Sequence, residues 1–164
     1  MSTEIERKFL IKMPDIGELA CRDGCVITLI RQTYLVREDG SERVRARLYA
    51  DKTVYTHTVK QRISSLSAYE DERVIGKAEY LSLLNRRDPD RNDIYKTRLA
   101  LPFDGHVFEI DVYPFWHRQA VMEVELAGEE EAVSFPPFVK IIREVSADRS
   151  YSNKSLSRKI PDED

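Results

Sequence analysis

The segment Thr3-Glu4-Ile5-Glu6-Arg7-Lys8-Phe9-Leu10-Ile11 alternates charged and apolar side chains over much of its length. A period of two predicts a β-strand with two unlike faces, because successive side chains of a strand point to opposite sides of the sheet. Glu4, Glu6 and Lys8 share one face of this strand, while apolar side chains dominate the other. The segment therefore predicts a strand that carries two carboxylates and an ammonium group in a row.

Seven further segments have a strand-like composition, and nearly all of them repeat this alternation. They cover residues 31–36, 42–49, 53–60, 69–75, 95–101, 107–112 and 121–126. Helical periodicity is strongest over residues 77–87, and shorter helices are expected over 14–21 and 129–135. Residues 150–160 are compatible with a short helix or a loop. Eight strands with few helices indicate an α+β fold dominated by a sheet.

The charges on these strands come in like-sign groups. The acidic pairs are Glu4/Glu6, Glu70/Glu72, Glu109/Asp111 and Glu123/Glu125, and the basic groups are Arg43/Arg45/Arg47 and Lys96/Arg98. Two like charges on one face of a strand lie about 7 Å apart, from a rise of ~3.3 Å per residue. Mixed signs would stabilise a solvated face better, so the sorting predicts a surface that holds groups of opposite charge. The pattern alone leaves open whether the charged faces meet water or line an interior.

An inward orientation of the charged faces predicts an eight-stranded β-barrel with a charged interior and a few helices packed outside. A barrel of this size has an interior that holds one small ligand. The apolar faces would then need a cover on the outside, which the helix expected over residues 77–87 can supply. These faces carry Phe9, Val44, Leu48, Phe108, Ile110 and Val124.

Length and composition restrict the class of protein. The 164 residues fit a single domain over residues 1–164, with 41% apolar and 34% charged side chains. The net charge of −3 argues against a nucleic-acid binder, which usually carries a basic excess. No apolar run approaches the ~20 residues that span a bilayer, and the N-terminus lacks the layout of a signal peptide. Cys21 and Cys25 have no further metal ligands nearby and indicate free thiols, so we expect a cytoplasmic protein.

The residue types on the charged faces point to a definite chemistry. Carboxylates are hard oxygen ligands suited to Mg²⁺ or Mn²⁺. Lysine and arginine donate charge-assisted hydrogen bonds to phosphate oxygens, and arginine can bind two oxygens at once. A polyphosphate that carries a divalent metal needs both kinds of side chain around it.

Taken in order, these motifs resemble those of the CYTH proteins, also called triphosphate tunnel metalloenzymes. Glu4-Ile5-Glu6-Arg7-Lys8 resembles the ExExK signature of that family, and the likeness runs over almost the whole chain. The other matching motifs are Arg45-Ala46-Arg47, Thr58-Val59-Lys60, Glu70-Asp71-Glu72, Lys96-Thr97-Arg98, Glu109-Ile110-Asp111, Glu123-Val124-Glu125 and the segment 148–154. One such motif is a weak signal, whereas eight in the family's order are a strong one. Ala68 departs from the pattern, because many relatives have an arginine ahead of the second ExE motif.

The resemblance implies an eight-stranded antiparallel tunnel that binds a triphosphate and a divalent metal, Mg²⁺ or Mn²⁺. The implied metal ligands are Glu4, Glu6, Asp111, Glu123 and Glu125, with Glu70, Glu72 and Glu109 as further tunnel acids. The implied phosphate contacts are Lys8, Arg43, Arg45, Arg47, Lys60, Lys96, Arg98 and Lys154. Lys8 and Tyr34 are the candidates for activation of the attacking water, and a base of either type predicts an alkaline optimum.

The function that the resemblance implies is metal-dependent hydrolysis of a triphosphate, with inorganic triphosphate as the first expectation. The alternatives are a class IV-type adenylate cyclase, a thiamine triphosphatase, and a non-catalytic module that binds polyphosphate or nucleotide. A thiamine or nucleobase site would need aromatic groups, and the loop around Trp116, the single tryptophan, is more typical of packing. We expect a small-molecule triphosphate as the partner, no nucleic acid or membrane partner, and a monomer or homodimer.

Overall fold

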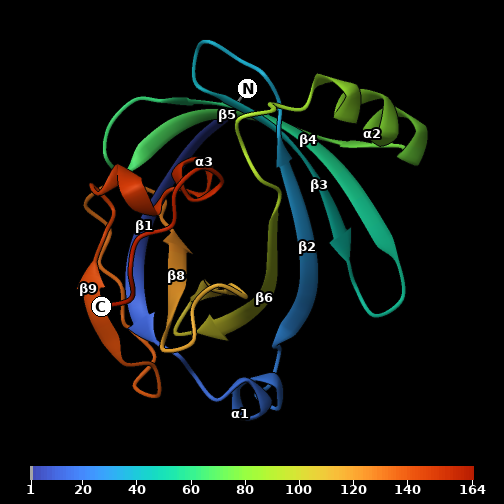
Figure 1. The fold of residues 1–164 in the computed structure, drawn as a ribbon. Helices are drawn as coiled ribbons and strands as arrows, with labels where there is room; N and C mark the ends of the chain where they lie inside the picture. The colour runs from blue at the N-terminus through green and yellow to red at the C-terminus, as the bar shows by residue number, and fades with distance from the viewer. Residues whose placement is uncertain (1) are drawn as a thin grey trace.

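Eight antiparallel strands form a closed ring, and a ninth short strand lies against its outside (Figure 1). The computed structural model describes residues 2–164. The strands are β1 (Ser2–Lys12), β2 (Val26–Tyr34), β3 (Ser41–Leu48), β4 (Thr53–Arg62), β5 (Ser67–Ile75), β6 (Ile94–Phe103), β7 (His106–Val112), β8 (Gln119–Glu125) and β9 (Ile141–Glu144). The helices are α1 (Ile16–Ala20), α2 (Lys77–Leu83) and α3 (Asn153–Leu156), with 3₁₀ turns at Leu84–Arg86 and Arg149–Tyr151. Within residues 2–164, no helix has the length and apolar character needed to cross a membrane.

The barrel closes through β1, which pairs with strands on both of its sides. The ring runs β5-β4-β3-β2-β6-β7-β8-β1, and the start of β1 returns to β5 through pairs such as Glu4 with Ala68. On its other side β1 pairs with β8 from Glu6 to Lys12. This closing contact joins residues 2–5 of β1 to residues 67–70 of β5, whereas residues 71–75 of β5 pair with β4 alone.

The register of the strands places the charged faces inside the barrel. Lys8 lies opposite Glu123, and Glu123 lies opposite Glu109, so one row of charge crosses β1, β8 and β7. These three side chains line an interior cavity, whereas the neighbouring Phe108 and Ile110 are fully buried on the other face of the sheet. The predicted eight-stranded antiparallel barrel with a charged interior is confirmed.

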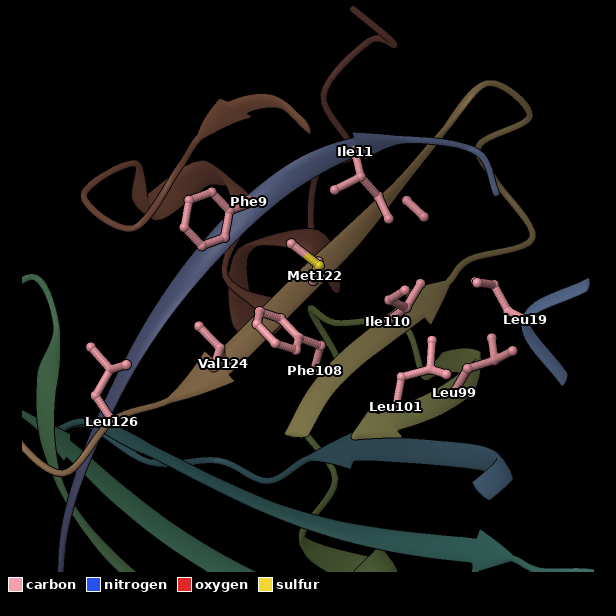
Figure 2. Packing of buried hydrophobic residues seen from close by; sticks show 11 residues of the cluster. Phe9, Ile11, Leu19, Leu99, Leu101, Phe108, Ile110, Met122, Val124 and Leu126 are labelled. Carbon is pink, nitrogen blue, oxygen red and sulfur yellow. The ribbon is translucent and has the colours of Figure 1, made fainter. Parts of the chain in front are cut away.

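The main apolar core lies outside the barrel, against β1, β6, β7 and β8 (Figure 2). Figure 2 shows Leu19 of α1 beside Leu99 and Leu101 of β6, with Met122 and Phe108 at the centre of the same cluster. Residues from the connection between β8 and β9 complete this cluster, including Phe135 and Phe138. Each strand therefore contributes to two unlike environments, with charge inside the ring and an apolar layer outside.

The prediction of a helix over residues 129–135 is wrong. This segment has no regular secondary structure, although it packs against the barrel. Val133 and Phe135 both contact the outer core, and the Phe135 ring lies 5.0 Å from the ring of Phe9. An extended chain points residues i and i+2 the same way, whereas a helix would turn them to different sides. The need to cover a long stretch of sheet with few residues therefore favours the extended form.

The helix predicted over residues 77–87 covers a second part of the outside. It appears as α2 followed by a 3₁₀ turn, and Tyr80 packs with Val44 and Ala46 of β3. Leu48 is 43% exposed, so the expectation that this residue would be covered is wrong. The shorter predicted helix over residues 14–21 is confirmed as α1.

A third apolar cluster closes one end of the barrel. Leu10 lies two residues beyond Lys8 on the same face of β1, and it packs with Val121 and Tyr113. The C-terminal segment adds Tyr151 and Leu156 to this cluster, so the short α3 lies at this end of the barrel. The sequence left residues 150–160 undecided between a short helix and a loop. The structure shows that this segment contains the short helix α3 and closes one end of the barrel.

Two features of the sheet lie outside the predicted strands. β2 begins at Val26 rather than at Arg31. The prediction missed residues 26–30 because four of the five are apolar, so this stretch lacks a clear period of two. β9 contains four residues and pairs only with residues 9–11 of β1. Such a short strand is too brief to carry a recognisable alternation.

The apolar core outside the barrel predicts unequal losses of stability for two neighbouring substitutions on β7. Phe108 is fully buried in the outer core, whereas Val107 points to the charged side and is 51% exposed. We expect Phe108→Ala to lower the free energy of unfolding by about 3–5 kcal/mol and Val107→Ala to change it by less than ~1 kcal/mol. Urea denaturation followed by circular dichroism measures both. Equal losses for the two variants would contradict this assignment of the core.

Candidate active site

The interior of the barrel contains a cavity of about 280 Å³ that is lined almost entirely by charged side chains. Its nine basic side chains are Lys8, Arg43, Arg45, Arg47, Lys60, Arg62, Lys96, Arg98 and Lys154. Its seven acidic side chains are Glu4, Glu6, Glu70, Glu72, Glu109, Glu123 and Glu125, and Tyr34, Ser41, Ser152 and Asn153 complete the wall. The structure thus brings together side chains from all eight strands of the ring and from the C-terminal segment.

The predicted site residues line this cavity with one exception. Asp111 is fully buried behind the wall, where Lys96 Nζ donates to its Oδ2 at 2.8 Å and Arg98 Nε donates to its Oδ1 at 2.7 Å. Burial alone would raise the pKa of Asp111, but Arg98 and Lys96 outweigh burial and lower it. Asp111 therefore fixes two cations of the wall in place.

Arg62, Ser152 and Asn153 line the cavity without having been predicted as site residues. Arg62 lies two residues beyond Lys60 on the same face of β4, so the period of two could have identified it. Ser152 and Asn153 belong to a stretch that has no strand periodicity. Their only signal in the sequence was the position of the neighbouring Lys154 in a family-like segment.

One wall of the cavity is a row of three arginines on β3. Arg45 Nη2 lies 2.5 Å from Glu72 Oε1, and Arg47 Nη2 lies 3.4 Å from the same oxygen. The Nε groups of Arg43, Arg45 and Arg47 are buried and have no hydrogen-bond partner in the structure. Burial and the neighbouring arginines lower the pKa of Arg45 to about 9. The positive charge of this row therefore exceeds that of its acidic partners, and three of its N–H donors have no acceptor.

Glu72 is the counter-charge for that row. Partial burial by itself raises the pKa of Glu72, but Arg45, the Thr58 hydroxyl and Arg47 together lower it to about 2. Thr58 Oγ1 donates to Glu72 Oε1 at 2.8 Å. A single carboxylate thus serves two guanidinium groups and one hydroxyl.

A cluster of carboxylates occupies the part of the cavity formed by β1, β5 and β8. Lys60 Nζ contacts Glu4 Oε2 and lies 3.7 Å from Glu6 Oε1 and 4.0 Å from Glu70 Oε2. Burial and the neighbouring Glu123 raise the pKa of Glu6 to about 8. The cluster is therefore crowded with carboxyl groups, and their mutual repulsion is offset only in part by one ammonium group.

Lys8 and Tyr34 lie in different parts of the cavity. Lys8 Nζ lies 3.3 Å from Glu123 Oε1 and donates to the Tyr151 carbonyl oxygen at 3.3 Å. Tyr34 is on β2, four strands from β1 in the ring of eight, and its hydroxyl accepts a hydrogen bond from Gln32 Nε2 at 2.9 Å. The two candidates for water activation therefore do not act on one another directly.

The carboxylates provide oxygen donors that fit a hard divalent cation. Within residues 2–164, no three or more of the Asp, Glu, His or Cys side chains are already arranged as a metal site. The acids converge on the ammonium groups of Lys60 and Lys8 instead. Glu70 Oε2 is buried without a hydrogen bond, which leaves acceptor capacity in the cluster. The donor set therefore fits a divalent cation, and its present arrangement is held by lysine.

A larger groove of about 680 Å³ lies along the outer face of β2, β3 and β6 and includes Leu29, Leu48 and Tyr95. Its lining is mainly apolar, and it contains few of the groups that bind phosphate or metal. The smaller interior cavity has the convergent charges, so it is the candidate active site.

Known proteins share the sequence and the fold of this chain. An inorganic triphosphatase from Nitrosomonas europaea is 36% identical over 163 residues, which cover 97% of this chain and 99% of that protein. The crystal structure of the inorganic triphosphatase NE1496 has a TM-score of 0.57 and 30% identity, over 97% of this chain and 100% of that one. The PH1819 protein from Pyrococcus horikoshii OT3 has a TM-score of 0.58 at 18% identity, over 77% and 80% of the chains, which shows the fold alone. No family model matches the chain.

The low pKa of Glu72 predicts how stability depends on pH. Because the folded-state pKa of about 2 lies below the ordinary value of 4.5, Glu72 stabilises the fold above pH 4.5. That contribution is lost as pH falls toward 2. We expect the stability difference between wild type and Glu72→Gln to shrink from about pH 6 to about pH 2.5.

Urea denaturation across this range measures the difference. Asp71→Asn is the matched control, because Asp71 is the adjacent residue on the exposed outer face of β5. A Glu72→Gln difference that stays constant with pH, as expected for the control, would contradict the assignment.

Proposed function

Because the chain belongs to the triphosphate tunnel metalloenzyme (CYTH) family, we propose that it hydrolyses inorganic triphosphate with Mg²⁺ or Mn²⁺ inside the barrel. The observation that carries this proposal is the row of buried, unpartnered Nε groups on Arg43, Arg45 and Arg47. Buried donors without partners are costly, and a polyanion in the cavity would satisfy them. An inorganic triphosphate has the charge and the repeated oxygens that match such a row.

The proposed triphosphate contacts surround the cavity from several strands. They are Lys8, Arg43, Arg45, Arg47, Lys60, Lys96, Arg98 and Lys154. Two of them are held in position by neighbouring groups: Arg98 by Asp111 and Glu109, and Lys154 by the Gly40 carbonyl oxygen at 2.6 Å. Positioned cations stabilise developing charge more effectively than mobile ones, because they need no reorganisation during the reaction.

The proposed metal ligands are Glu4, Glu6, Glu123 and Glu125 on the adjacent strands β1 and β8. Glu6 pairs directly with Glu125 across the two strands, so the four carboxylates lie within a small part of the wall. A bound Mg²⁺ or Mn²⁺ would neutralise phosphate oxygens and orient a water molecule. Asp111 was predicted as a fifth ligand, but its bonds to Lys96 and Arg98 favour a positioning role for it.

In the proposed reaction a water oxygen attacks the terminal phosphorus, and the bond from that phosphorus to the bridging oxygen breaks. The products are orthophosphate and pyrophosphate, and one proton of the attacking water passes to the unprotonated amine of Lys8. Lys8 is the group proposed for this step, because its Nζ lies 3.3 Å from Oε1 of the proposed metal ligand Glu123. Tyr34 lies beside Arg43, so we assign it to positioning phosphate.

The cytoplasmic location expected from the sequence forms part of the proposal. A triphosphatase of this kind would act on a small soluble anion, and the two cysteines are free in the structure. Free thiols fit a reducing compartment.

Phosphate release tests the proposed reaction. Purified protein should release orthophosphate from inorganic triphosphate with Mg²⁺ or Mn²⁺ and none after chelation of the metal. Loss of one charge-assisted contact in Arg45→Met should lower kcat/KM by about 10- to 100-fold. Arg73→Met, which removes an exposed arginine from the outer side of β5, is the matched control and should retain the activity.

ATP and thiamine triphosphate assayed in parallel identify the preferred substrate. Absence of metal-dependent release from inorganic triphosphate at any pH would contradict the proposal.

The roles of Lys8 and Tyr34 predict different pH profiles. Lysine accepts a proton only as the free amine, so wild-type kcat should rise toward alkaline pH. Lys8→Met should abolish this rise and reduce kcat by about 100-fold or more, whereas Tyr34→Phe should raise KM and keep the rise. Circular dichroism establishes that both variants are folded. An alkaline rise retained in Lys8→Met but lost in Tyr34→Phe would reverse the two assignments.

A further inference from the structure

Lys60 occupies the centre of the acidic cluster. Its ammonium group contacts Glu4 and lies within 4.0 Å of Glu6 and Glu70. Among residues 2–164, no other basic side chain forms an ion pair with any of these three carboxylates. One lysine therefore serves as the counter-cation for three acids, two of which are proposed metal ligands.

The strand register places Lys60 at the boundary between the two halves of the site. β4 lies between β5, which carries Glu70, and β3, which carries the arginine row. Lys60 is directly opposite Glu70 on one side and opposite Ser41 on the other. The lysine stem is long and flexible, so from this position its ammonium group can turn toward the acids or toward a phosphate held by the arginines.

Lys8 provides a useful contrast within the same cavity. Its ammonium group is held by the Tyr151 carbonyl oxygen as well as by Glu123. In the described part of the chain, Lys60 has no comparable backbone acceptor, and carboxylates alone hold it. Lys60 is thus held only by carboxylates, whereas Lys8 also has a neutral backbone acceptor.

We propose that Lys60 blocks the metal site as an internal counter-cation, and that triphosphate opens the site by drawing the Lys60 ammonium group away from Glu4 and Glu6. This inference rests on the proposed function, since it assigns a further role to one residue of that site. An ammonium group and a divalent cation compete for the same carboxylate oxygens. Binding of triphosphate therefore frees the ligands that the metal needs.

Coupling of this kind is reciprocal. If triphosphate increases the affinity for metal by some factor, metal increases the affinity for triphosphate by the same factor. The free protein should then bind divalent metal weakly, and removal of Lys60 should strengthen metal binding without any triphosphate. A lysine that only held the barrel together would produce neither effect.

Calorimetric titration of Mn²⁺ into the protein of residues 1–164 at one fixed pH, without triphosphate, tests the competition. We expect Lys60→Met to bind Mn²⁺ about tenfold more tightly than wild type, and Lys60→Arg to remain close to wild type. Arg62→Gln is the matched control, since Arg62 lies two residues along on the same face and forms no ion pair with a carboxylate in the described part of the chain. It should change the affinity by less than about threefold. Equal effects of Lys60→Met and Arg62→Gln would overturn the proposal.

A second titration uses the wild-type protein and needs no variant. Imidotriphosphate, in which nitrogen replaces the bridging oxygens, should increase the Mn²⁺ affinity of wild type by about tenfold or more, and this increase should be smaller in Lys60→Met. No increase in wild type would overturn the coupling even if the variant failed to fold. The result is separate from catalysis: coupling without phosphate release would contradict the proposed function alone, and release without coupling would contradict only the role of Lys60.

Discussion

Carboxylates and guanidinium groups face each other across the closed barrel, and the rest of the fold depends on how they neutralise one another. Arg45 is 4% exposed and Lys96 is 4% exposed, so neither cation is fully hydrated. Charges withdrawn from water destabilise a fold unless they are paired. Glu72 and Asp111 supply part of the pairing. The remaining donors of the arginine row are the part that a bound polyanion would satisfy.

A charged interior moves the apolar packing to the outside of the ring. Phe108 and Met122 pack there with α1 and with the extended connection before β9, while α2 covers β3. The cap formed by Leu10 and Tyr151 closes one end and positions the C-terminal segment that carries Lys154. The outer cover and the cap at one end therefore both bury apolar side chains away from the charged cavity.

The alternation of residues predicted the strands and the residues that share each face, because neighbours such as Phe108 and Glu109 must point to opposite sides. It did not show which face was inside, since both orientations satisfy a period of two; the family resemblance supplied that choice. The extended cover around Phe135 was missed because its shape depends on the barrel beneath it. The contacts of Lys60 with Glu4 and Glu6 were also hidden, because they join strands that are distant in the sequence.

Diffraction from crystals grown with Mn²⁺ and imidotriphosphate is the sharpest test of whether the barrel interior binds metal and triphosphate, because anomalous scattering locates the metal independently of the protein. We expect a manganese peak inside the barrel, within coordination distance of Glu4, Glu6, Glu123 or Glu125, and three phosphorus positions along Arg43, Arg45 and Arg47. Manganese bound only to acids on the outer surface, or an analogue seated in the outer groove beside Leu29 and Tyr95, would contradict it.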